Sequence, residues 1–179
     1  MIVVKKGWLG NVVEIGIALL FIIGSLLLLR RSKKSALPIA IYYLLAVVNL
    51  AFLIREPMSL YHYTLRPFTA LRNAIEFDGS IVPGLLTGFI KVTSWGSLKG
   101  VLLNILLFVP CGFLVPTTWK RNWSCWKVVL LGFSASLCIE MIQFVTRCGY
   151  ADVDDLINNM IGTWVGYILY KYFLRDQQT

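Results

Sequence analysis

Three polar side chains in one long apolar stretch of this sequence are of types that could do chemistry. Glu140, Gln143 and Arg147 follow one another at spacings of three and four residues, which place them along one face of a helix. An ionisable group in hydrocarbon costs several kcal/mol unless it is paired or reaches water. An acid, an amide and a base on one face therefore indicate either a polar contact between helices or a binding site.

More polar residues lie in the two neighbouring apolar stretches or beside them. Asn104 belongs to the preceding stretch, and Asp152, Asp154, Asp155 and Asn159 lie around the start of the following one. An aspartate at a helix start accepts backbone hydrogen bonds and suits the positive end of the helix dipole, so we expect at least one aspartate to be a cap. Carboxylates at this spacing are compatible with Mg²⁺ or Ca²⁺, but we expect no metal and no cofactor.

The elements that position these residues are expected to be membrane helices. The chain has 179 residues, of which 58% are hydrophobic and 15% charged, whereas a soluble domain carries about 25% charged residues. At about 20 residues per crossing, the length allows about five spans in a single membrane domain, 1–179. The predicted fold class is all-α, a polytopic transmembrane bundle with spans at about 12–29, 37–54, 98–115, 128–146 and 156–174.

The order of these spans brings the polar residues to one side of the membrane. The start of span 98–115, the end of span 128–146 and the start of span 156–174 must share a side, so the polar residues lie within roughly 10 Å of one face. They either hold the helices together or line a water-accessible pocket for a ligand, and their number favours the pocket. The set is Asn104, Glu140, Gln143, Arg147, Asp152, Asp154, Asp155 and Asn159.

Basic residues predict the orientation. The net charge of +8 indicates topology rather than nucleic-acid binding in so apolar a chain, and no nucleic-acid partner is expected. One side collects a dense set, and the positive-inside rule places it with the C-terminus in the cytoplasm and the N-terminus outside, although Lys5 and Lys6 favour the reverse. The set is Arg30, Arg31, Lys33, Lys34, Lys120, Arg121, Lys127, Lys171 and Arg175.

Other features are weaker signals. The segment 55–96 mixes charged and apolar residues, and we expect it to lie in the interface or to re-enter the membrane. His62 is the only histidine, and the four cysteines show no zinc-binding spacing, so free thiols are expected. Gly162 and Gly166 form a GxxxG pair, which permits close helix packing but is common by chance in apolar segments. The standard nucleotide, serine-hydrolase and zinc-protease motifs do not occur.

Two strings, NILLFVPCGFLVP at 104–116 and EMIQFVTRCGYADVDDLINNMIGTWVG at 140–166, together resemble the VanZ-like family of bacterial membrane proteins. The resemblance covers a core at about 98–174. Arg66, Pro67 and Phe68 resemble a further family element that ends in Pro-Phe, although an apolar residue is expected in place of the arginine. The family's motif residues match Asn104, Phe108, Pro110, Gly112, Phe113, Glu140, Gln143, Arg147, Asp152, Asp154, Asp155, Asn159, Gly162 and Gly166.

The resemblance implies a small polytopic protein of the bacterial cell surface, linked to resistance to glycopeptides such as teicoplanin, with no settled reaction. One hypothesis is a non-enzymatic protein whose outward-facing pocket binds a lipid headgroup, a cell-wall precursor or the antibiotic, with Arg147 and Arg66 holding a phosphate. A second is an intramembrane enzyme acting on a lipid-linked sugar or phosphate, with Glu140 or Asp155 as general base. A third is a transporter, or a subunit that buries a Glu140–Arg147 pair. The oligomeric state is not predicted.

Overall fold

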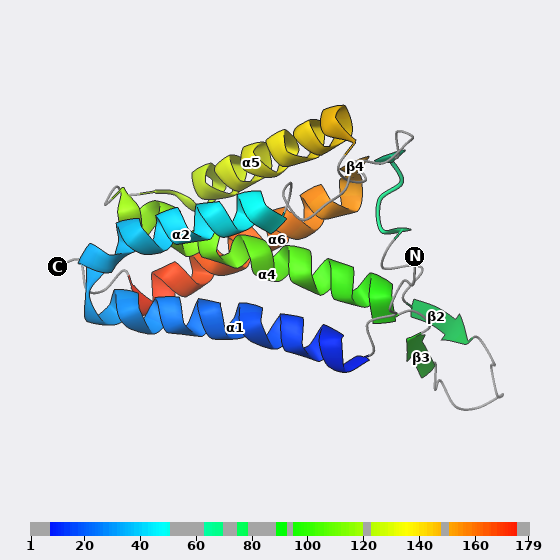
Figure 1. Cartoon of the computed structure of the whole chain (residues 1–179), viewed down its shortest axis with the longest axis horizontal. Coiled ribbons are helices and arrows are strands. Elements are labelled where there is room, and N and C mark those ends of the chain that lie inside the picture. The colour runs from blue at the N-terminus through cyan, green and yellow to red at the C-terminus, as the bar shows by residue number, and fades with distance from the viewer. Residues whose placement is uncertain are drawn as a thin grey trace.

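The structure is a computed structural model that describes residues 8–50, 63–69, 75–78, 89–92, 95–119, 123–147 and 151–174. It is mostly helical, and the five predicted helices are all found (Figure 1). They are α1 (Trp8–Arg31), α2 (Ala36–Val48), α4 (Trp95–Thr118), α5 (Cys125–Thr146) and α6 (Val153–Phe173), with a 3-10 turn, η1 (Lys33–Ser35), between the first two. The last four residues predicted for the second span, 51–54, lie outside the described residues.

The helix ends differ from the predicted ones by a few residues, and local chemistry explains one case. The last helix begins at Val153 rather than at position 156, because Asp152 is its N-cap. A capping aspartate fixes the start of a helix by accepting a hydrogen bond from a backbone N–H of the first turn. The three residues after Asp152 therefore belong to the helix.

Short strands, which an all-α prediction does not contain, lie in and beside the loops. β1 (Tyr63–Thr64) pairs in parallel with β4 (Ala151–Asp152), and β2 (Ile75–Asp78) pairs antiparallel with β3 (Phe89–Val92). Three of these strands belong to the segment predicted to be interfacial or re-entrant. The described parts of that segment include a β-hairpin, and the all-α prediction is corrected to this extent.

The helix α4 is the centre of the bundle. It contacts each of the other four helices, most extensively α6. The two backbones approach closely, because a Cβ at Gly162 would overlap the carbonyl oxygen of Ile105, and a Cβ at Gly166 would overlap that of Val109. The GxxxG pair thus provides close helix packing here.

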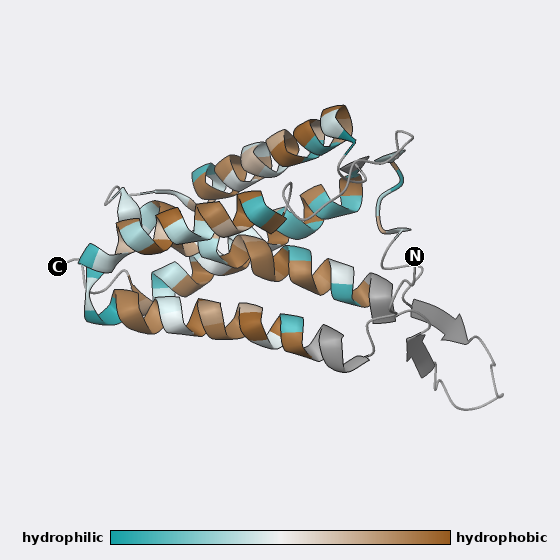
Figure 2. Cartoon of the chain, in the orientation of Figure 1, coloured by the Kyte–Doolittle hydropathy of each residue, from teal (hydrophilic) through white to brown (hydrophobic). Residues whose placement is uncertain are grey.

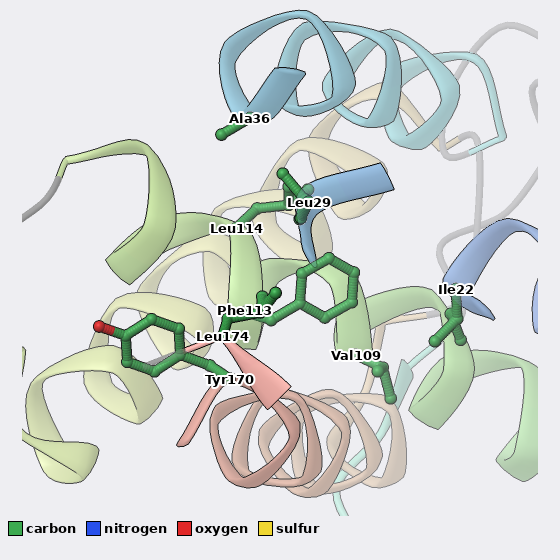
Figure 3. Packing of buried hydrophobic residues seen from close by; sticks show 8 residues of the cluster. All are labelled: Ile22, Leu29, Ala36, Val109, Phe113, Leu114, Tyr170 and Leu174. Carbon is green, nitrogen blue, oxygen red and sulfur yellow. The ribbon is translucent and has the colours of Figure 1, made fainter. Parts of the chain in front are cut away.

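A hydrophobic core joins α1, α4 and α6. Phe113, Leu29 and Leu174 are fully buried in it, and Figure 3 shows their side chains pointing toward one another from three helices. Full burial of one such side chain stabilises the fold by about 1.5–3 kcal/mol. The remaining members of this cluster are Ile22, Ala36, Val109, Leu114 and Tyr170.

Within the part of the chain that the structure describes, three helices are long and apolar enough to cross a membrane, over Val13–Arg31, Leu98–Thr118 and Cys125–Thr146. In Figure 2, apolar residues run along these helices. The helix α2 has 13 residues, which extend about 20 Å against a hydrocarbon core of about 30 Å. The last helix, α6, is long enough, but Asp154, Asp155 and two asparagines interrupt its apolar content. The total of five crossings stays a prediction.

Candidate functional site: a polar cluster at one end of the bundle

The start of α4, the end of α5 and the start of α6 lie at the same end of the bundle, on the right of Figure 1. Hydrogen bonds join them. The Asn104 side-chain amide donates to Asp155 Oδ1, and the backbone N–H of Asp152 donates to Glu140 Oε2 at 3.0 Å. The structure thus brings together the residues that the order of the spans places on one side. We call the following residues the polar cluster: Asn104, Glu140, Gln143, Asp152, Asp154, Asp155 and Asn159.

Asp152 holds the start of α6, as expected of at least one aspartate. Its backbone is extended, and its carboxylate accepts a hydrogen bond from the backbone N–H of Asp154 at 2.9 Å. Burial raises the pKa of the Asp152 carboxyl, the nearby Asp154 carboxylate raises it further, and the hydrogen bond from the Asp154 N–H lowers it. A carboxyl with a raised pKa is readier to hold a proton near neutral pH.

Asp154 is buried, and it fastens a distant segment to α6. Its Oδ1 accepts a hydrogen bond from the backbone N–H of Phe68, and its Oδ2 lies 3.3 Å from Thr69 Oγ1. Thr69 Oγ1 also donates to the Arg66 carbonyl oxygen at 2.7 Å. Phe68 has a φ of 60°, a left-handed conformation that is uncommon for a bulky residue. A hydrogen bond to a charged acceptor, worth about 1.5–3 kcal/mol, offsets the cost of that conformation.

The interior of the polar cluster is formed by side chains of α5 and α6. Glu140 and Gln143 are 7% and 3% exposed, and Asn159 is 5% exposed. Asn159 Nδ2 donates to Ser136 Oγ at 2.8 Å. The other amide atom, Asn159 Oδ1, is buried and has no hydrogen-bond partner in the described part of the chain. A buried acceptor of this kind costs free energy unless a polar group reaches it.

The two predicted arginines lie at the same end but are exposed. Arg147 is the C-cap of α5, with a φ of 57°, so the helix ends before it and it does not continue the stripe of Glu140 and Gln143. That part of the prediction is wrong, because the spacing argument assumes helical backbone through position 147. Arg66 is exposed on the segment that Asp154 fastens. In the chain alone, Arg147 is exposed whereas Glu140 is buried.

Among the described residues, no three His, Cys, Asp or Glu side chains are placed so that they could hold a metal ion. The aspartates instead accept hydrogen bonds from backbone and amide groups. Cys111, Cys125 and Cys138 are free thiols, as predicted, and Cys148 lies outside the described residues.

Sequence reasoning missed several partners in and near this site. Members of the polar cluster contact Ser136, Thr69 and the backbone N–H of Phe68. The sequence gives no indication that a particular hydroxyl or backbone group will bind one of these residues. Farther along the same end, Lys99 Nζ of α4 lies 2.6 Å from Glu14 Oε2 of α1. Glu14 did carry a signal, because it is an acid inside the first apolar span.

Comparison with known proteins identifies the family of this chain. The VanZ/LLP1 family matches residues 17–175. Protein VanZ of Enterococcus faecium is 31% identical over 78 residues, which are 44% of this chain and 48% of that protein, so the match spans about half the length of this curated relative. No solved structure matches. The family match and the three described helices that are long and apolar enough to cross a membrane fit a bacterial membrane protein. Because the match extends over most of its length, the chain belongs to the VanZ/LLP1 family.

Proposed function

We propose that this protein is a non-enzymatic component of the bacterial envelope that contributes to resistance to glycopeptides such as teicoplanin. In this proposal the polar cluster faces outward and binds a lipid headgroup, a cell-wall precursor or the antibiotic. The observation that carries it is the convergence of carboxylates and amides from three helices with the segment that carries Arg66. Packing alone seldom requires so many polar groups at one end of a bundle.

Burial divides the cluster into supporting residues and residues that can reach a ligand. Glu140, Gln143 and Asp154 are buried, and their role is to hold the end of α5 and the start of α6. Asp152 and Asp155 are half-buried, whereas Arg66 and Arg147 are exposed at the same end. The two half-buried carboxylates suit a cationic or polyhydroxyl group, and the guanidinium groups suit a phosphate.

The buried Oδ1 of Asn159 also supports a binding role. A hydroxyl or ammonium group that reached it would satisfy an acceptor that otherwise weakens the fold. Teicoplanin and cell-wall precursors are rich in hydroxyl and amide donors. The polar cluster therefore offers hydrogen-bond acceptors, and Arg66 and Arg147 beside it offer exposed cations. Together they suit a headgroup that carries both hydrogen-bond donors and an anionic group.

The test is protection of susceptible cells from teicoplanin by variants that keep the packing. In Asp152→Asn the amide oxygen can still accept from the Asp154 N–H, and in Asp155→Asn an amide oxygen can still accept from Asn104. We expect both variants, at wild-type levels in the membrane, to protect no better than an empty vector. Lys171→Gln, on an exposed residue of the opposite end, is the control and should protect fully. Full protection by the two cluster variants would contradict the proposal.

A second candidate, an intramembrane enzyme acting on a lipid-linked sugar or phosphate, is favoured by the raised pKa of Asp152 beside Glu140 and Asp154. A carboxyl whose pKa is raised toward neutrality is suited to proton transfer. Purified protein would be incubated with lipid II or undecaprenyl phosphate, with and without Mg²⁺. A new product that Asp152→Asn abolishes would favour the enzyme, and no product under either condition would exclude these two substrates.

A further inference from the structure

We infer that the groove between α1 and α2 is a binding site for an anionic phospholipid, with one acyl chain along the groove and the phosphate at the turn between the two helices. This site lies at the end of the bundle opposite to the polar cluster. It does not depend on the proposed function.

The groove has the dimensions and chemistry of a lipid-chain site. It has a volume of about 350 Å³, in the lower range of ligand pockets, about 300–1,000 Å³. Its walls are almost wholly apolar. The hydroxyl groups of Ser25 and Tyr42 are the polar side-chain groups in the lining. The walls include Leu20, Phe21, Gly24 and Leu28 of α1 and Pro38 and Tyr42 of α2.

One wall of the groove is shaped to leave room. Gly24 has no side chain, and a Cβ built there would meet nothing within 4 Å. Phe21 of α1 and Tyr42 of α2 both line the groove, and their ring centroids are 5.7 Å apart. Leu20, Leu28 and Tyr42 are 71%, 55% and 63% exposed. These apolar surfaces are open to the bilayer, where an acyl chain is the available apolar partner.

The turn at the end of the groove supplies the complementary charge. Leu28 and Pro38, which line the groove, flank a stretch that carries Arg30, Arg31, Lys33 and Lys34. We call these four residues the basic turn. Arg30, Arg31 and Lys34 are exposed. A basic group of four directly beside a membrane span attracts anionic lipids, and guanidinium groups bind phosphate oxygens in pairs.

The apolar groove and the basic turn together favour an anionic phospholipid as the occupant. An acyl chain that follows α1 from Leu20 to Leu28 emerges beside the basic turn, where a phosphate would meet the exposed cations of Arg30, Arg31 and Lys34. A zwitterionic lipid has the same chains but brings its own ammonium group into this cluster of positive charge. A phosphatidylglycerol-type lipid brings a net negative charge and should be preferred.

The experiment is native mass spectrometry of the full chain in detergent, titrated with phosphatidylglycerol or with phosphatidylethanolamine of identical chains. We expect one phosphatidylglycerol to remain bound with an affinity about tenfold above that of phosphatidylethanolamine, equivalent to about 1.4 kcal/mol. Gly24→Leu fills the groove and should lower the affinity for phosphatidylglycerol by a similar factor. Gly16→Leu is the matched control, because Gly16 lies on the same helix and a Cβ there also meets nothing within 4 Å.

The charge is tested separately with Arg30→Gln/Arg31→Gln, which leaves the groove intact. This double variant should lose the preference for phosphatidylglycerol while retaining chain binding, whereas Lys127→Gln/Lys171→Gln, at the same end, should keep it. Equal affinity for the two lipids in the wild-type chain would overturn the inference. So would unchanged binding by both test variants, displacement by undecaprenyl phosphate at equal concentration, or a dimer of the chain that excludes lipid from the groove.

Discussion

Asp154 illustrates how a residue of a predicted ligand set can be needed by the fold itself. It is 4% exposed and accepts a hydrogen bond from the backbone N–H of Phe68, 86 residues away in sequence. A hydrogen bond to a carboxylate is stronger than one to a neutral amide oxygen. The carboxylate of Asp154 therefore holds the 63–69 segment more firmly than an asparagine would.

We expect Asp154→Asn to destabilise the protein by about 1–2 kcal/mol, because a hydrogen bond to a charged group contributes about 1.5–3 kcal/mol and one between neutral groups about 0.5–1.5 kcal/mol. The 63–69 segment should also loosen, which chymotrypsin cleavage after Phe68 would report. Asp155→Asn is the comparison, because its partner is the side-chain amide of Asn104, which can rotate to match. Equal thermal stability and equal cleavage of the two variants would show that Asp154 does not hold the segment.

Asp152 predicts a pH dependence of stability. Its pKa in the folded protein is raised, chiefly by burial, so the folded state holds the proton more tightly than the unfolded chain does. The resulting stabilisation is present below the unfolded pKa of about 3.9 and is lost as the pH rises through the higher folded pKa. Asp152→Asn keeps a good N-cap but does not titrate.

Wild-type protein should therefore lose stability relative to Asp152→Asn as the pH increases from about 4 toward neutrality. Melting curves of both proteins in detergent over this range measure the difference. Glu140 and Asp154, the carboxyls that face Asp152, are present in both proteins, so the difference between the two melting curves reports Asp152. Melting temperatures that run parallel at all pH values would contradict the assignment.

At the scale of elements, the sequence predicts the helices well because their apolar stretches are long. It also predicts which helix ends lie on the same side of the membrane, because consecutive spans alternate in direction. Asn104 and Asp155 belong to different helices, yet the order of the spans suffices to bring them together. The end of this helix at Thr146 agrees with the predicted span 128–146. The alignment of Arg147 with Glu140 and Gln143 fails because the left-handed backbone at Arg147 has no signal in the residue spacing. The attachment of Phe68 to Asp154 depends on the path of a loop and has no pattern in the sequence.

The strands were missed for a different reason. Ile75–Asp78 reads Ile-Glu-Phe-Asp, an alternation of apolar and polar residues that is typical of a strand, and it pairs with β3 as an antiparallel hairpin. In a chain this apolar, the same alternation also fits a segment lying in the interface. The strands β1 and β4 have two residues each, which is too short for any period to appear.

The packing of α4 against α6 gives the sharpest prediction for an element. A Cβ at Gly166 would overlap the Val109 carbonyl oxygen and lie 2.9 Å from the Cα of Gly112, whereas a Cβ at Gly100, also on α4, meets nothing within 4 Å. Backbone atoms cannot move aside singly, so the helices must separate. We expect Gly166→Ala to destabilise the bundle by about 1–3 kcal/mol, the usual cost of overpacking.

Gly100→Ala, the same chemical change on the partner helix, should leave the stability unchanged or raise it by about 0.5–1 kcal/mol, because alanine is the better helix former. Heat-induced aggregation of the two variants in detergent separates these outcomes. If both variants aggregate at the same temperature, the helices do not approach as closely as the structure requires.

Among the described residues, charge differs between the two ends of the bundle. One end carries Arg30, Arg31 and Lys34, together with Lys127 and Lys171. At the other end, the carboxylates of the polar cluster and Glu14 outnumber the cations of Arg66, Arg147 and Lys99. The net positive charge of the described residues is therefore concentrated at the end with the basic turn. By the positive-inside rule this end should face the cytoplasm, which would expose the polar cluster to the antibiotic.

This orientation predicts which positions a membrane-impermeant maleimide can reach in intact cells. In a background with all four cysteines replaced by alanine, Leu65→Cys, on the exposed segment beside the polar cluster, should be labelled without permeabilisation. Ser32→Cys, exposed beside the basic turn, should be labelled only after permeabilisation. The reverse result would place the polar cluster in the cytoplasm, where it could not meet an extracellular glycopeptide. Direct binding of the antibiotic would then have to be abandoned even if the variants of Asp152 and Asp155 had lost protection.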